Sequence, residues 1–153
     1  MISTQKLKDA ERVVRITMIV ILLTAGSSKF FSNGAFFDYY SELFQGELRI
    51  NLPSSMVDLF LLTVPFIELT LGLALLSNKY KNYTAYAWLG FMLSLMFGHY
   101  ILQEWSAVNE MLDYIFLGLL YLVLPAHSSW LARDRQDNLS TSTSTSTSTS
   151  TSI

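Results

Sequence analysis

The sequence predicts an all-α protein that crosses a membrane as a four-helix bundle, with both termini in the cytoplasm. Three observations lead to this prediction. Of the 153 residues, 51% are hydrophobic and only 14% are charged. Four hydrophobic segments approach the length of about 20 residues that a helix needs to cross a bilayer. Most of the basic residues, finally, fall on one side of these segments.

The four predicted spans cover residues 13–31, 56–76, 83–102 and 107–124. Helices suit these segments because every backbone polar group in lipid must be satisfied within its own segment. The alternation expected of membrane β-strands is absent from the sequence. Residues 1–130 therefore form one transmembrane domain. In the alternative interpretation, residues 1–28 are a cleaved signal peptide, and three spans remain.

The basic residues predict the orientation of the spans. Only Lys29 and Arg49 lie towards one side, whereas eight of the ten basic residues lie towards the other. Those eight are Lys6, Lys8, Arg12, Arg15, Lys79, Lys81, Arg133 and Arg135. The positive-inside rule makes their side cytoplasmic. We therefore expect a multi-pass protein of a bacterial-type cytoplasmic membrane.

Two segments outside the spans have patterns of their own. Between the first two spans, apolar residues recur with helical spacing from Phe36 to Phe44, and Gly46 is expected to end this helix. Such a helix would rest in the outer membrane interface, cap the bundle or contact a partner. Residues 131–153 are mostly alternating serine and threonine, which cannot bury a core, so we expect a disordered cytoplasmic tail.

Ionisable side chains inside the predicted spans are the candidate functional residues, because a charge near the bilayer centre costs about 2.5–3.5 kcal/mol to insert. They are Arg15, Lys29, Glu68, His99, Glu110 and Asp113. Glu68 lies about 18 Å along its helix, so it must be protonated or paired with Arg15 or Lys29. Such a pair could serve only to fix helix register. A proton relay or a ligand contact is the functional alternative.

The remaining candidates suggest a pocket at the outer surface. Lys29, His99, Glu110 and Asp113 reach a similar depth when the chain is threaded through the membrane. They would line a polar pocket that opens outward, or they would simply extend towards the headgroups. Small residues at Gly90, Ser94 and Gly98 repeat every four positions on the third span, which favours close helix packing there.

Composition excludes several kinds of chemistry. Without cysteine, the chain holds no thiol centre, disulfide or iron–sulfur cluster. His99 and His127 fall near opposite faces of the membrane, so one haem cannot bind both. No ligand spacing indicates a metal site. The net charge of −2 gives no reason to expect nucleic acid. We expect no catalytic residue and no complete enzyme on this chain.

The polar residues stand in an order that has a known parallel. Arg15 precedes Lys29 by fourteen positions, small residues stand at 25–28, and Glu68 begins the sequence Glu-Leu-Thr-Leu-Gly after a loop that contains Pro53. Over residues 12–125 this order resembles the DoxX-like family of small four-helix membrane proteins. The resemblance places Arg15, Lys29 and Glu68 at motif positions. Related methylamine-utilisation proteins work in disulfide formation, which a chain without cysteine cannot itself carry out.

The resemblance implies an accessory membrane subunit of a quinone-linked redox complex, with the bilayer and other membrane or redox proteins as partners. Donors such as Lys29 and His99 beside aromatic side chains would suit a quinone carbonyl. The alternative is an assembly or stability factor for other membrane proteins, which would act through the Gly90, Ser94 and Gly98 face or through the 36–44 helix. A transporter is the third hypothesis, although the sequence has no internal repeat.

Overall fold

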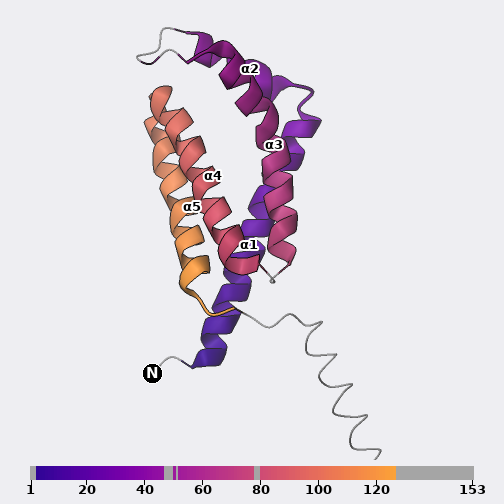
Figure 1. Ribbon diagram of the computed structural model, residues 1–153, viewed down its shortest axis with the longest axis vertical. Coiled ribbons are helices and arrows are strands. Elements are labelled where there is room, and N and C mark those ends of the chain that lie inside the picture. Colours follow the sequence, from indigo (N-terminus) through magenta and orange to yellow (C-terminus); the bar gives the residue numbers. More distant parts are fainter. Residues whose placement is uncertain (1–2, 47–49, 51, 78–79, 127–153) are drawn as a thin grey trace, which may run out of the picture.

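The computed structural model describes residues 3–46, 50, 52–77 and 80–126, and this part of the chain is helical (Figure 1). It contains five α-helices and no strand. They are α1 (Thr4–Phe31), α2 (Ala35–Gln45), α3 (Ser54–Leu76), α4 (Lys81–Ile101) and α5 (Trp105–Val123). The all-helical prediction is thus confirmed for these residues. The predicted tail, residues 131–153, lies outside them.

Local interactions explain where α1 and α2 begin and end. The Ser3 side chain accepts a hydrogen bond from the Lys6 amide at 3.4 Å, so α1 starts well before the predicted span. After α1, Asn33 and Gly34 adopt left-handed backbone angles, with φ of 51° and 87°, and turn the chain into α2. As expected, α2 stops before Gly46, whose amide returns to the Leu43 carbonyl.

The four long helices form two pairs. α1 packs mainly against α3, and α4 packs mainly against α5, whereas fewer contacts join one pair to the other. Figure 1 shows α2 lying across one end of the two pairs, which we call the α2 end. The N-terminus of α1 extends beyond the opposite end, which we call the N-terminal end.

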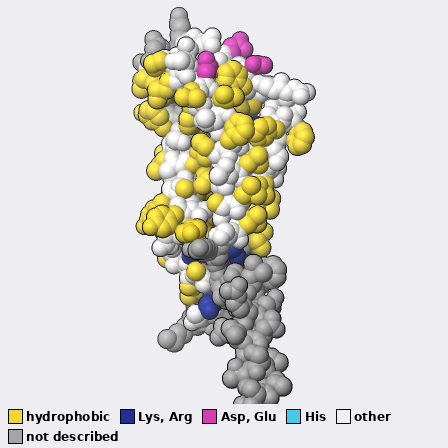
Figure 2. All heavy atoms as spheres, turned by 45° about the vertical axis from the view of Figure 1, so that its right-hand side comes forward, with side chains coloured by type: hydrophobic (Ala, Val, Ile, Leu, Met, Phe, Trp, Pro, Cys, Tyr) yellow, Lys and Arg dark blue, Asp and Glu magenta, His cyan; other side chains and the backbone are white. Residues whose placement is uncertain are grey.

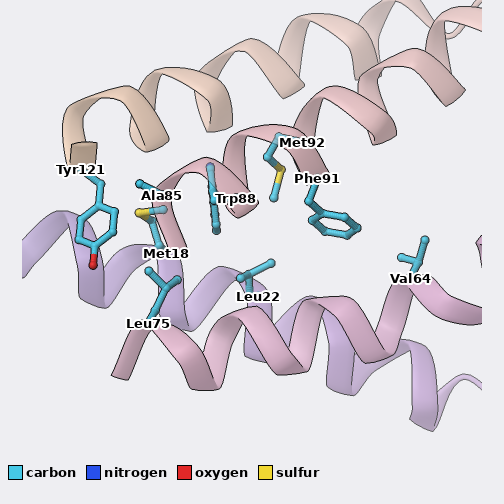
Figure 3. Close-up of a cluster of buried hydrophobic side chains, with 9 residues drawn as sticks. All are labelled: Met18, Leu22, Val64, Leu75, Ala85, Trp88, Phe91, Met92 and Tyr121. Carbon is cyan, nitrogen blue, oxygen red and sulfur yellow. The ribbon is translucent and has the colours of Figure 1, made fainter. Parts of the chain in front are cut away.

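The two pairs meet through a shared apolar core (Figure 3). Its buried members are Met18, Leu22, Val64, Leu75, Ala85, Trp88, Phe91, Met92 and Tyr121. Trp88 is fully buried, and its indole Nε1 donates a hydrogen bond to the Tyr114 carbonyl at 2.8 Å. This bond ties α4 to α5 while the indole ring reaches into the core between the pairs.

The outer surface of the long helices is apolar. Large side chains such as Val13 on α1, Leu59 on α3 and Phe116 on α5 are each more than 60% exposed. Figure 2 shows apolar side chains over the length of the visible face, with acidic groups near the α2 end and basic groups near the N-terminal end. An apolar surface of this extent is expected where helices contact lipid.

Three helices, α1, α3 and α5, are long and apolar enough to cross a membrane. α4 corresponds to the predicted span 83–102 but is not among them. Its 21 residues would extend about 31 Å, yet its tyrosines, together with Lys81, Asn82 and His99, lower its hydropathy. The fourth crossing and the cytoplasmic location of both termini therefore remain predictions.

Close packing between helices occurs at glycines other than those singled out on α4. A Cβ added at Gly90 would meet no atom within 4 Å, and one at Gly98 would meet only Phe44, at 3.8 Å. The Ser94 hydroxyl bonds to its own helix, at the Phe91 carbonyl. At Gly118, by contrast, an added Cβ would lie 2.5 Å from Trp88. The four-residue spacing places Gly90, Ser94 and Gly98 on one face of α4, but it does not determine which helix packs against that face.

We expect Gly118→Ala to destabilise the protein by about 1–3 kcal/mol, because the new methyl group would overlap the buried Trp88 ring. Gly90→Ala is the matched control, since its methyl group enters open space and favours helix by up to about 1 kcal/mol. Thermal unfolding of both variants in mild detergent measures the difference. Equal stability of the two would contradict the close approach of α5 to α4.

Candidate functional site

A cavity of about 320 Å³ lies beneath α2, between the two helix pairs. Its wall is mostly apolar, and its polar side chains are Lys29, Tyr40, Glu68, His99 and Tyr114. Each of the five helices contributes one of these five residues. Three of them, Lys29, Glu68 and His99, were expected from the sequence as candidate functional residues.

Lys29 and Glu68 form an ion pair at the edge of the cavity. The Lys29 Nζ lies 2.5 Å from Glu68 Oε1 and 2.7 Å from Oε2, and the two side chains are 17% and 5% exposed. The ammonium group also lies 4.9 Å from the centre of the Phe36 ring, where the negative face of the ring attracts it. Lys29, and not Arg15, is thus the cation beside Glu68.

His99 is held at the cavity by a carboxylate that sequence reasoning missed. Its Nδ1 lies 2.7 Å from Glu104 Oε2, and its ring meets the Tyr40 ring edge to face at 5.9 Å. Glu104 lies in the short turn between two predicted spans and was therefore not among the ionisable residues expected inside the membrane. Gln103 adopts a φ of 60° in that turn, and the Glu104 amide bonds to the His99 carbonyl at 3.0 Å. This turn brings the carboxylate back beside the imidazole.

α2 caps the cavity with the apolar face that its sequence predicted. Phe36, Tyr40 and Phe44 line the cavity, whereas Asp38 on the opposite face is exposed. Burial raises the pKa of the Tyr40 phenol, and the charge of Glu104 raises it further. The Tyr40 hydroxyl therefore remains a hydrogen-bond donor at neutral pH. The structure thus shows α2 as a cap on the cavity, whereas its placement in the membrane interface and its contact with a partner stay predictions.

Glu110 and Asp113 do not join the cavity, although they were expected at its depth. Both are exposed on α5, whereas Met111 and Tyr114, each one position further along, line the cavity. Because successive residues of a helix are rotated by about 100°, residues at equal depth can face opposite directions. The expected pocket therefore contains Lys29 and His99 but neither of these carboxylates.

Arg15 lies far along α1 from Lys29 and has a different partner. Its Nε is 3.7 Å from Oε1 of Glu11, a buried residue just before the predicted first span. His127 lies outside the described residues. Among the residues that the structure describes, no three histidine, aspartate or glutamate side chains are grouped so that they could hold a metal ion.

The family model of methylamine utilisation protein MauE matches residues 8–111 of this chain. The chain belongs to the MauE family. The match includes Lys29, Tyr40, Glu68, His99 and Glu104, so the charged groups described at the cavity lie within it. Together with the three apolar helices, membership of the MauE family makes this chain a multi-pass integral membrane protein. No curated protein and no solved structure matches the chain.

The MauE match corrects the resemblance to the DoxX-like family, which was wrong. That resemblance depended on the order of Arg15, Lys29 and Glu68, and the structure does not bring the three together. Lys29 pairs with Glu68, whereas Arg15 lies beside Glu11. Small residues at helical spacing recur wherever membrane helices pack, and ionisable residues inside spans mark functional sites in unrelated membrane proteins. Their order in the sequence therefore discriminates poorly between families.

Proposed function

We propose that this chain is an accessory membrane protein of a redox pathway and that the cavity beneath α2 binds the head of a quinone. The MauE family suggests a role in methylamine utilisation, alongside other proteins of that pathway. The observation that carries the proposal for the cavity is the convergence of Lys29, Tyr40 and His99 on one apolar space. A few polar groups in an apolar cavity of roughly 300–1,000 Å³ are typical of small-molecule sites.

The donors and rings at this cavity suit a quinone. A quinone head is a flat ring with carbonyl oxygens that accept hydrogen bonds. Glu68 engages Lys29 through its two carboxylate oxygens, and an ammonium group has three N–H donors. The Tyr40 hydroxyl and the His99 ring add further donors, and the Phe36 and Phe44 rings supply apolar surface. The chain would bind and orient the quinone, while a partner protein would exchange electrons with it.

The same proposal includes four membrane crossings with the N-terminal end in the cytoplasm. α4 packs along α5, which is apolar enough to cross, and its estimated length of about 31 Å is close to the hydrocarbon thickness. The basic residues favour a cytoplasmic N-terminal end. In this orientation the cavity beneath α2 would lie on the outer side of the membrane.

Filling the cavity from Gly98 tests quinone binding without removing a polar group. We expect Gly98→Leu to weaken the binding of decylubiquinone by at least about tenfold, because an added side chain there has room to enter the cavity. Gly90→Leu places the same side chain on the exposed side of α4 and should bind like the unmodified protein. Calorimetric titration of the detergent-purified proteins measures the affinities.

Two results would overturn the proposal for the cavity. One is an unmodified protein that neither retains quinone during purification nor binds decylubiquinone. The other is equal affinity of Gly98→Leu and Gly90→Leu, which would place any quinone site elsewhere on the surface. The thermal unfolding temperature of each variant shows whether a loss of binding reflects loss of the fold.

A further inference from the structure

A second group of buried polar side chains lies at the opposite end of the molecule from the cavity. We call Glu11, Arg15, Lys81 and Tyr121 the inner polar cluster. Glu11 and Arg15 come from α1, Lys81 begins α4, and Tyr121 lies in the last turn of α5. The Arg15 Nε lies 3.7 Å from Glu11 Oε1, and the Lys81 Nζ lies 5.1 Å from the centre of the Tyr121 ring. The charges of Glu11 and Arg15 are close enough to act on both Lys81 and Tyr121. None of them lines the cavity beneath α2.

Several atoms of this cluster have no hydrogen-bond partner among the described residues. Glu11 is 0% exposed, yet neither of its carboxylate oxygens is hydrogen-bonded. The Nε of Arg15 forms an ion pair with Glu11 Oε1 at 3.7 Å, a distance too long for a hydrogen bond, and the buried hydroxyl of Tyr121 is also not hydrogen-bonded. Lys81, in contrast, donates to the Leu124 carbonyl and lies 5.1 Å from the centre of the Tyr121 ring. Buried polar groups are nearly always satisfied, so these atoms indicate a polar ligand at this position.

The charges restrict what that ligand can be. Arg15 and Lys81 would attract an anion, but the Glu11 carboxylate beside them would repel it. A simple cation would suit Glu11 but would be repelled by Arg15 and Lys81. The free carboxylate oxygens need hydrogen-bond donors, while the Arg15 Nε needs an acceptor. A group that carries a phosphate next to a primary ammonium satisfies all of these requirements together.

The depth of the cluster in the membrane fits a lipid headgroup. Glu11 lies about 30 Å before Phe31 along α1, at 1.5 Å per residue, which equals the thickness of the hydrocarbon core. Lys81 is the first residue of α4, and Leu124 caps the end of α5, so the cluster lies at the helix ends. The Arg15 side chain lies beside the buried Glu11 carboxylate and is itself 13% exposed, so this side of the cluster reaches the molecular surface.

We propose that the inner polar cluster binds the headgroup of a phospholipid that carries both a phosphate and a primary ammonium, as phosphatidylethanolamine does. The phosphate contacts Arg15 and Lys81, and the ammonium donates hydrogen bonds to the Glu11 carboxylate. Basic pockets between membrane helices commonly hold lipid phosphates at the cytoplasmic surface. The Glu11 carboxylate, whose oxygens accept no hydrogen bond among the described residues, gives this pocket its selectivity for the ammonium. The proposal does not depend on the quinone site, which lies at the other end of the bundle.

Lipid competition tests this selectivity. The protein is reconstituted in vesicles with equal parts of phosphatidylethanolamine, phosphatidylglycerol and phosphatidylcholine, released in mild detergent, and analysed by native mass spectrometry. We expect phosphatidylethanolamine to be retained over phosphatidylcholine, whose methylated ammonium has no N–H donor. Glu11→Gln should reduce that preference by about tenfold, because it removes a charged hydrogen-bond acceptor. The exposed Glu42→Gln on α2 should retain it.

Retention of phosphatidylglycerol at the level of phosphatidylethanolamine would overturn the proposal, because charge attraction alone would then account for binding. An unchanged preference in Glu11→Gln, or no selective retention by the unmodified protein, would overturn it too. If Glu11→Gln does not fold, Tyr121→Phe replaces it, since it removes only a hydroxyl group, which in this proposal accepts a further hydrogen bond from the lipid ammonium. That variant should lower the preference by about two- to tenfold.

Discussion

Glu68→Gln is expected to destabilise the folded protein by about 3–5 kcal/mol, because it leaves the Lys29 ammonium partly buried without its counter-charge. The two Lys29–Glu68 contacts are short, and the Glu68 side chain is only 5% exposed. Water therefore cannot replace the lost carboxylate efficiently. Unfolding by a denaturing detergent, followed through helix content, measures the change in stability.

The double variant Lys29→Met, Glu68→Leu separates the cost of an unpaired charge from the net contribution of the pair. It should recover most of the loss, because replacing both partners by apolar groups of similar size is often neutral. A double-mutant cycle that also includes the single variants Lys29→Met and Glu68→Leu gives the coupling energy. Glu110→Gln, which changes an exposed carboxylate on α5, should alter stability by no more than about 0.5 kcal/mol. A fully stable Glu68→Gln variant would mean that Glu68 is protonated and unpaired.

Trp88→Ala is expected to cost about 3–5 kcal/mol, because it empties the largest fully buried position where the two helix pairs meet. It also removes the hydrogen bond from the indole to the Tyr114 carbonyl. Trp88→Phe keeps an aromatic ring and should lose less. The same denaturing-detergent titration measures both variants.

Tyr83→Leu is the control on the same helix, since Tyr83 is 78% exposed, and it should change stability by no more than about 0.5 kcal/mol. A Trp88→Ala variant as stable as this control would contradict the core that Figure 3 shows. It would also mean that α4 and α5 are held to the other pair by contacts outside this core.

Much of the helical organisation follows from local sequence. Apolar runs of about 20 residues predict long helices because the backbone must satisfy its own polar groups in lipid. The periodic face from Phe36 to Phe44 predicts the short helix α2, and Gly46 marks its end. The cost of inserting charge pointed to Lys29, Glu68 and His99 as residues with a role, and all three line the cavity. Family membership was not predictable in this way, because unrelated membrane proteins use the same kinds of polar and small residues inside their helices.

The tertiary structure alone decided which polar groups meet. From the sequence, either Arg15 or Lys29 could pair with Glu68. The packing of α1 on α3 determines that Lys29 is the partner. Glu104 became part of the site through a backbone turn at Gln103. Glu11 precedes the first predicted span and was therefore not a candidate functional residue, yet it is fully buried. Spacing along a helix determines depth and the shared face, whereas partners depend on how each helix is rotated against its neighbours.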